Sequence, residues 1–325
     1  EPTLVARDTL LGLKAQQQRT VAERSTAGGA VRIASRGEAV VESGATVDLS
    51  GGSLAVRPGQ VKTTLLNASG KIVDASEARA DVRYDGIATR YVIDYGRWNR
   101  QEVIDLGQSL RYAQADVEGR DAGVRETFGI GGLFAQPSIV GATTTGERQR
   151  ALALAPRGAR WVVGYDGPSA ADRSQVPATG GYVTQDYKLN QDVILAGAAA
   201  SLPAGFRPGD ALPADLRSTL QLDTRQVAAG RVAELSVLSN QAVSVRDAIR
   251  APDGGALNIV GANVDIGADL VSTGGAISVT ARNTAGRLAD ALPAPRLAVA
   301  DGVTIATRGA WVNERPGVGG ASAAP

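Results

Sequence analysis

The sequence of 325 residues contains no cysteine, histidine or methionine, and only 4% of it is aromatic. Without cysteine the chain forms no disulfide, and without cysteine or histidine it lacks thiolate and imidazole metal ligands. Ser-His-Asp triads, cysteine nucleophiles and histidine bases are excluded, so an enzyme would have to use carboxylates, Lys, Arg, Tyr or Ser. Because methionine is absent, we expect a mature product or a segment of a longer protein.

The sequence also lacks an excess of charge of one sign, since 34 basic residues balance 33 acidic ones and leave a net charge of +1. Nucleic acid is therefore not expected as the main partner, because phosphate binding needs a clustered basic excess. No stretch approaches the roughly 20 apolar residues of a membrane span, so we do not expect a transmembrane protein. Few aromatics and 40 glycines favour thin stacked layers over one thick core.

What the sequence does contain is a repeated pattern, found at residues 26–52, 252–275 and 298–312. Short alternating segments such as Leu257-Asn258-Ile259 show the period of two that is typical of strands with one buried face. Glycine pairs mark turns about every 20 residues, close to one turn of a solenoid with three short strands. Stacking such turns buries an aliphatic row that one turn alone leaves exposed. The pattern predicts an all-β parallel β-helix; a β-sandwich is the alternative, but its hairpin and aromatic signals are weak.

The pattern divides the chain into five parts. We predict a helix or extended segment at 1–25, β-helix coils at 26–52, coils interrupted by long insertions at 53–225, regular coils at 226–313 and a disordered tail at 314–325. The regular pattern is expected to restart at Val227. The proline-rich residues 202–213 are expected to form neither helix nor central strand.

An aromatic and basic cluster in residues 90–100 is the main candidate binding site. Rings on exposed insertions can grip the flat apolar faces of sugars, and arginines would favour an anionic glycan. The alternative is that the rings pack the insertion onto the flank of the β-helix, because alternation places Tyr91, Ile93 and Tyr95 on one side of a strand. The candidate residues are Tyr91, Tyr95, Arg97, Trp98 and Arg100.

Carboxylates are the remaining candidates for chemistry. The acids Asp74, Asp81, Asp85, Glu102 and Asp105 could supply a glycosidase pair, but no spacing singles out two of them, and turn chemistry explains them as well. Asp253-Gly254-Gly255 is a single turn rather than a calcium-binding series. We expect no catalytic residue, no metal site and no cofactor.

Several phrases, taken together, carry a family resemblance. They are GGAxxIxGxNVxIGAxLxSTGG at 254–275, VKTTLL at 61–66, ASGK at 68–71, DVRYDGIA at 81–88, VEGRDAG at 117–123, GERQ at 146–149 and TRGAWVN at 307–313. In this order they resemble the filamentous haemagglutinin-like exoproteins of two-partner secretion in Gram-negative bacteria. The resemblance covers residues 26–313, and the secretion-signal domain of that family is not visible.

The resemblance implies a right-handed parallel β-helix that an outer-membrane partner pore secretes to the bacterial surface. It further implies an interior or C-terminal segment of a fibrous adhesin, a virulence factor that attaches to host cells, glycans or other bacteria, with this part as a rigid shaft. The family offers no catalytic motif to transfer, so we do not expect an enzyme. Two alternatives stay open: the stalk of a contact-dependent growth inhibition toxin, and a β-helical polysaccharide lyase or hydrolase.

Overall fold

The computed structural model describes residues 24–35, 37–105, 109–129, 131–151, 154–164, 189–198, 200–282 and 294–309. Within them most residues of regular structure are β-strands, and the largest sheet is parallel, so the expectation of an all-β protein is confirmed. The predicted segment 1–25, except for its last two residues, and the predicted tail 314–325 lie outside the described residues. None of the described helices is both long and apolar enough to span a bilayer.

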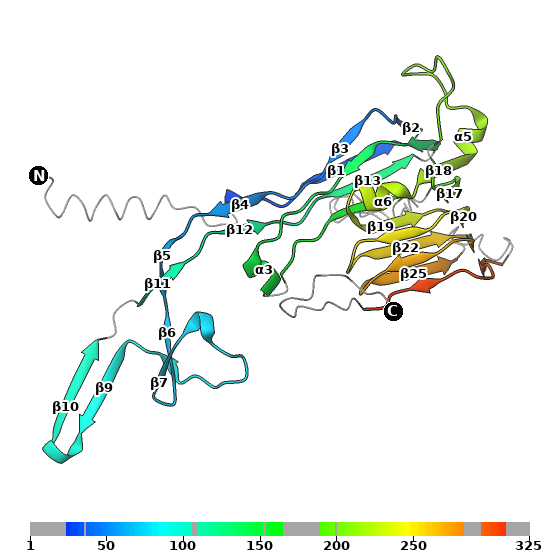
Figure 1. Ribbon diagram of the computed structural model, residues 1–325. Coiled ribbons are helices and arrows are strands. Elements are labelled where there is room, and N and C mark those ends of the chain that lie inside the picture. Colours follow the sequence, from blue (N-terminus) through cyan, green and yellow to red (C-terminus); the bar gives the residue numbers. More distant parts are fainter. Residues whose placement is uncertain are drawn as a thin grey trace, which may run out of the picture.

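The first sheet is a stack of six parallel strands (Figure 1). Because parallel neighbours cannot be joined by a tight turn, the chain leaves the sheet after each strand and comes back to the next. In order across the sheet the strands are β1 (Ala30–Ser35), β13 (Val124–Gly129), β16 (Ala159–Val163), β19 (Val232–Leu238), β22 (Ala256–Gly261) and β25 (Ala276–Ala281).

Between successive strands of the first sheet, the chain forms strands of two further parallel sheets. The second sheet is β18 (Thr219–Asp223), β17 (Asp192–Ala196), β20 (Ala242–Val245), β23 (Asn263–Ile266) and β26 (Arg296–Val299). The third sheet is β21 (Ile249–Ala251), β24 (Leu270–Ser272) and β27 (Ile305–Ala306). The triplets β19–β20–β21, β22–β23–β24 and β25–β26–β27 therefore pair strand for strand, each with the next.

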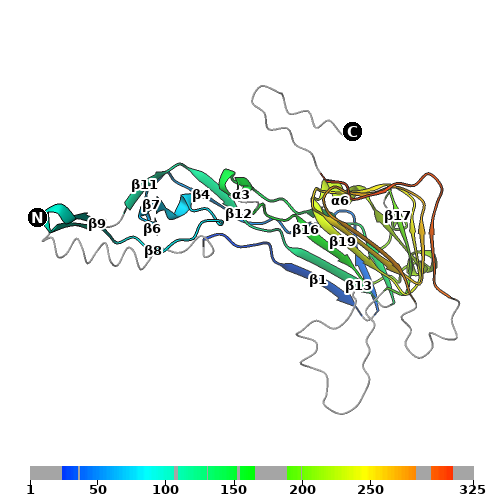
Figure 2. The same ribbon diagram turned by 90° about the horizontal axis from the view of Figure 1, so that it is seen from below.

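The first two passes of the chain follow the same order with shorter sheets. After β1 come β2 (Glu38–Val41) and β3 (Thr46–Asp48), and after β13 come β14 (Gly132–Ala135) and β15 (Ser138–Val140). Strands β2 and β14 pair in parallel, as do β3 and β15. In Figure 2, β19 and β17 lie on opposite sides of the interior, which shows how the strands of different sheets face one another.

The core lies between these sheets and is built from rows of aliphatic side chains. The register places Leu235 opposite Leu257 and Leu257 opposite Ile277 in the first sheet, and Val243 opposite Val264 in the second. Leu235, Leu257, Val243 and Val264 are at most 1% exposed. Each buried aliphatic side chain contributes about 1.5–3 kcal/mol, so rows of this kind account for most of the stability. The alternation predicted for residues 252–275 is confirmed, because every second residue of β22 and β23 faces this core.

Strand β14 is not paired with β18. The side chain of Gln191, just before β17, links β14 to the short helix α5 (Ala214–Ser218), and the side chain of Gln136, just after β14, reaches β18. The buried side chain of Gln191 accepts a hydrogen bond from Leu133 N (2.7 Å) and donates to Leu133 O (3.1 Å) and Leu216 O (2.8 Å). Gln136 Nε2 donates to Gln221 O at 2.6 Å. A primary amide carries the same kinds of donor and acceptor as a peptide bond, so Gln191 bonds to Leu133 N and Leu133 O as a neighbouring strand would.

Residues 53–119, between β3 and β13, form an antiparallel arm. Its first part is a ribbon in which β4 (Ser53–Val56) pairs with β12 (Asp116–Gly119) and β5 (Gly59–Thr63) pairs with β11 (Ser109–Ala113). Beyond the ribbon come a three-stranded sheet and a hairpin. Their elements are β6 (Leu65–Ala68), β7 (Lys71–Asp74), η1 (Ala75–Glu77), β8 (Gly86–Ile87), β9 (Arg90–Tyr95), η2 (Gly96–Trp98) and β10 (Arg100–Asp105).

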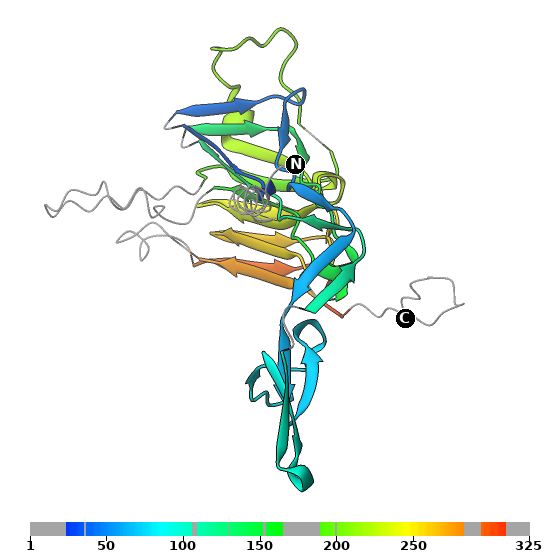
Figure 3. The ribbon, with the colours of Figure 1, turned by 90° about the vertical axis from the view of Figure 1, so that its left-hand side faces the viewer.

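The arm projects away from the parallel sheets, and the β9–β10 hairpin lies at its far end (Figures 1 and 3). Large apolar side chains on the arm are open to solvent, among them Ile87 at 68% and Leu110 at 61% exposure. Two-stranded ribbons have two faces and no enclosed core, so they cannot bury such residues by themselves. The arm therefore has a large exposed surface and no core of its own, whereas the parallel sheets, which we call the body, enclose the core.

In the part of the chain that the structure describes, three short α-helices accompany the strands: α3 (Glu147–Ala151), α5 (Ala214–Ser218) and α6 (Arg225–Ala229). The regular strands expected from Val227 onward begin five residues later, because Val227 lies in α6 and the next strand begins at Val232. Helix α6 packs against β15, β19 and β21, and it buries Val227 completely. The alanines after Val227 favour a helical turn, and Gly230 ends it. Residues 202–213 form neither helix nor strand, as predicted.

Candidate functional site

The hairpin at the end of the arm turns through η2 and one left-handed residue. Asn99 has φ 44° and ψ 43°, and its N–H is bonded to Gly96 O at 3.3 Å. Asparagine tolerates this conformation better than most residues, which explains its place at the reversal. The register then puts Tyr95 directly opposite Arg100 and Ile93 opposite Glu102. Side chains that are distant along the two strands are thus brought to one face of the hairpin.

An aromatic and basic cluster occupies this tip. The rings of Tyr95 and Trp98 are 6.2 Å apart between centroids and tilted by 56°, and Arg97 Cζ lies 6.0 Å from the Trp98 ring centroid. Trp98 is 70% exposed. A hollow of about 500 Å³ is lined by Tyr95, Trp98, Arg100, Gln101 and Glu102. A ring with one open face beside guanidinium groups can stack on an apolar surface and bond to an anion at the same time.

A polar contact fixes the Tyr95 ring. Its hydroxyl donates to Glu102 Oε2 at 3.2 Å. This hydrogen bond, together with the negative charge of the carboxylate, raises the pKa of Tyr95 above its usual value. The phenol is therefore protonated at neutral pH and lines the hollow as a neutral group.

Replacing Glu102 by glutamine tests this contact. Glutamine carries no negative charge and accepts a weaker hydrogen bond than a carboxylate does, so the pKa of Tyr95 should fall towards that of a free tyrosine. The measurement is an NMR titration of the tyrosine Cζ signals, with the signal of Tyr95 assigned from a Tyr95→Phe variant. A titration midpoint that does not move on Glu102→Gln would show that the hydrogen bond does not form in solution.

Four of the five predicted site residues, Tyr95, Arg97, Trp98 and Arg100, meet at the hairpin tip. The backbone of Tyr91 pairs with Ile104 in the same hairpin, and its side chain lies outside what the structure describes. The alternative in which the rings pack the insertion onto the body is wrong for Trp98, because the ring is mostly exposed at the far end of the arm. The sequence cluster was found because its members are neighbours along the chain.

Three of the five carboxylates considered for catalysis have structural partners, and the side chain of Asp105 lies outside what the structure describes. Asp81 pairs with Arg79 at 2.7 Å, Asp85 accepts a hydrogen bond from Ser69 N at 2.8 Å, and Glu102 holds Tyr95. In the described part of the chain no group of three potential ligands is placed to hold a metal ion. These contacts explain Asp81, Asp85 and Glu102 as residues that stabilise the arm itself.

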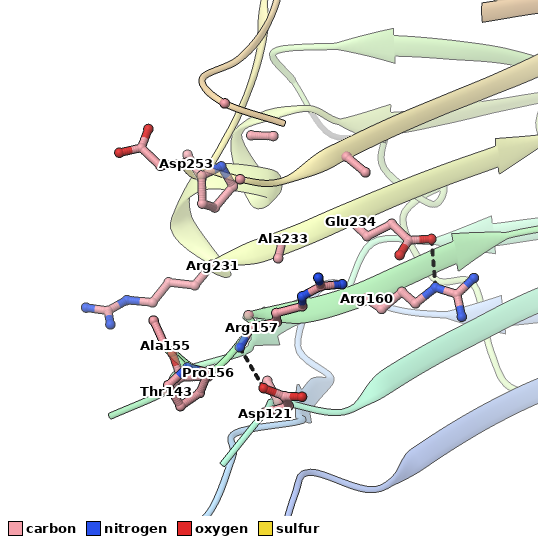
Figure 4. A pocket seen from close by; sticks show the side chains of 18 of the residues that line it. Asp121, Thr143, Ala155, Pro156, Arg157, Arg160, Arg231, Ala233, Glu234 and Asp253 are labelled. Atoms are coloured by element: carbon pink, nitrogen blue, oxygen red, sulfur yellow. Dashed lines mark hydrogen bonds and ion pairs between the residues drawn. The ribbon is translucent and has the colours of Figure 1, made fainter. Parts of the chain in front are cut away.

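A groove of about 1170 Å³ on the body was not anticipated (Figure 4). Its floor is formed by small residues at the corners of successive passes, and four arginines line it. Arg160 is paired with Glu234 at 2.7 Å. The guanidinium groups of the other three have no partner among the described residues; they are Arg157, Arg231 and Arg250. We call this surface the arginine groove.

Backbone contacts hold two of these arginines in place. Arg157 N donates to Asp121 Oδ1 at 2.8 Å, and Arg231 O accepts from Ala159 N at 3.1 Å. Arg231 has φ 50°, a left-handed conformation that disfavours a residue with a Cβ by roughly 1–2 kcal/mol. Figure 4 shows its side chain directed away from that of Arg160. The groove thus presents separated cations rather than one dense cluster.

No local sequence pattern indicates the arginine groove. Arg157, Arg231 and Arg250 are far apart along the chain, and only the stacking of successive passes brings them to one surface. Comparisons with protein-family models, curated proteins and solved structures found no match to this chain.

Proposed function

We propose that the chain is a segment of a secreted fibrous adhesin of the filamentous haemagglutinin-like type, displayed on a Gram-negative cell surface. In this proposal the parallel sheets form the shaft and the tip of the arm contacts the ligand. The observation that carries it is the exposed cluster of Tyr95, Trp98 and two arginines at the end of a projecting hairpin. Loops and projections on a rigid scaffold are where binding residues usually lie.

The proposed shaft is a right-handed parallel β-helix. Its support is the strand-for-strand pairing of the triplets β19–β20–β21, β22–β23–β24 and β25–β26–β27, together with rows of like side chains between them. Crossovers between parallel strands of one sheet are nearly always right-handed. A continuous ladder of backbone hydrogen bonds along such a stack resists bending, which a fibre that holds a binding site away from a cell requires.

The proposed ligand is an anionic glycan of a host cell or of another bacterium. A sugar ring would stack on the open face of Trp98, and its carboxylate or sulfate would lie between Arg97 and Arg100. One such contact is weak, but many copies on a surface gain strength from effective concentration. Secretion through an outer-membrane partner pore belongs to the same proposal and is supported by the family resemblance.

Replacing Trp98 by alanine should weaken binding to an acidic glycan by about tenfold, because the stacking face is lost. The melting temperature should stay unchanged, since the ring is mostly exposed. Binding is measured on an array of acidic and neutral glycans with the purified chain, and the affinity for the best ligand by calorimetry. Arg97→Ala should weaken binding of acidic glycans selectively.

The matched control is Tyr112→Ala, which removes a ring of 55% exposure from the ribbon of the same arm but away from the tip. Its binding should equal that of the unaltered chain. Binding that is unaffected by Trp98→Ala but lost on Arg231→Ala with Arg250→Ala would place the contact in the arginine groove and contradict the proposal for the tip.

A further inference from the structure

Three buried polar side chains inside the stack have no hydrogen-bonding partner. Arg125 and Thr127 are completely buried, and Trp161 is 2% exposed. The atoms without a partner among the described residues are Arg125 Nε, Nη1 and Nη2, Thr127 Oγ1 and Trp161 Nε1. Buried polar atoms are nearly always satisfied by protein, water or an ion, so a group of five in one region calls for an occupant.

The three residues face the interior from two adjacent strands. Arg125 in β13 stands opposite Val31 in β1 and opposite Trp161 in β16. Arg125 Cζ lies 5.6 Å from the Trp161 ring centroid. Thr127 is two residues further along β13, so it points to the same side of the strand as Arg125. The unpartnered groups therefore share one stretch of the interior.

The unpartnered groups in this stretch are hydrogen-bond donors. A guanidinium offers five N–H groups and an indole one, and neither has an acceptor site; a hydroxyl can also donate. No carboxylate of the described residues pairs with Arg125, whereas arginines on the outer face of the same sheet are paired, as Arg160 is with Glu234. The contact with Trp161 offsets part of the charge but provides no acceptor for the N–H groups.

Burial alone does not remove the charge. It lowers the pKa of Arg125 to about 10, which still leaves the guanidinium protonated at neutral pH. An isolated cation in an apolar interior is strongly unfavourable unless a counter-charge is present. A water molecule would satisfy N–H groups but would leave the charge uncompensated.

We propose that a small inorganic anion of halide size is held in the interior between β1, β13 and β16, against Arg125, Trp161 Nε1 and Thr127 Oγ1. The neighbouring side chain of Val31 and the ring of Trp161 are apolar, which leaves the anion no competing ligands. Because the site lies inside the stack, the anion acts as a structural counter-ion that is enclosed when the passes of the chain close on one another.

The direct test is crystallography of the full chain grown in sodium bromide, with anomalous data at the bromine absorption edge. We expect a bromide peak within hydrogen-bonding distance of Arg125. Density for water without an anomalous signal, or bromide at surface sites only, as an adventitious ion, would overturn the proposal. This measurement uses the unaltered protein and is unaffected by any folding defect of a variant.

A solution measurement gives a second test. At constant ionic strength, exchanging gluconate for a chloride concentration about 100 times the dissociation constant should raise the melting temperature by about 5 °C. Arg125→Met should abolish this dependence on chloride. Arg160→Met is the matched control, since Arg160 lies on the outer face of the adjacent strand, and it should keep the full dependence. A melting temperature of the unaltered chain that ignores chloride would contradict the proposal.

Discussion

Replacing Gln191 by alanine should lower the free energy of unfolding by about 3 kcal/mol. The Gln191 amide forms three hydrogen bonds with backbone groups of two separate segments, to Leu133 N, Leu133 O and Leu216 O. The side chain is 1% exposed, so water cannot take over these bonds without entering the interior. Each buried backbone group left without a partner costs about 1–3 kcal/mol, and several are left here.

Urea unfolding followed by circular dichroism measures the effect, with the slope of the transition used to confirm that the same surface is exposed. The control is Gln241→Ala, in which an exposed glutamine is truncated and a change below about 0.5 kcal/mol is expected. Gln191→Glu should also destabilise, because a carboxylate oxygen would replace the donor that faces Leu133 O. A Gln191→Ala variant as stable as the unaltered chain would mean that other contacts hold Leu133 in β14 and Leu216 in α5.

Gln191 also shows why part of this fold could not be predicted from the sequence. Alternation at Leu257-Asn258-Ile259 identifies a strand because the signal is local and the next pass repeats it. The bond from Gln191 to Leu133 spans 58 residues, and nothing near either residue indicates the other. Periodicity therefore predicts the strands, but it does not indicate the places where a side chain, rather than a neighbouring strand, bonds to a strand's backbone.

The same contrast separates the two candidate sites. The hairpin tip was predictable because Tyr95, Arg97 and Trp98 are neighbours in sequence and one turn keeps them together. The direction of the arm was not, since its antiparallel ribbon pairs segments about 50 residues apart. Arg125 was missed for another reason. In β13 the charged Arg125 is completely buried whereas the apolar Val124 is only half-buried, so the alternation of apolar residues does not identify the inner face of this strand.

Replacing Gly28 by alanine should destabilise the chain by about 3 kcal/mol or more, whereas Gly29→Ala should leave it unchanged. A Cβ on Gly28 would overlap Leu49 O and Gly123 N and lie 2.9 Å from Ala122 C. All three are backbone atoms, which cannot rotate away as a side chain can. A Cβ on Gly29 would meet nothing within 4 Å. Adjacent glycines thus make a matched pair with opposite expected results.

The reason for the large effect is that Gly28 lies where three segments cross at the root of the arm. Gly28 N donates to Asp121 O at 2.8 Å, and Gly123 N donates to Leu49 O at 2.7 Å. Making room for a methyl group would break these bonds in addition to creating overlap, so the loss exceeds that of ordinary overpacking, about 1–3 kcal/mol. Thermal and urea unfolding of both variants measure the difference. If Gly28→Ala unfolded like Gly29→Ala, the three segments could not be in contact at this point, and the arm would have to leave the body by a different path.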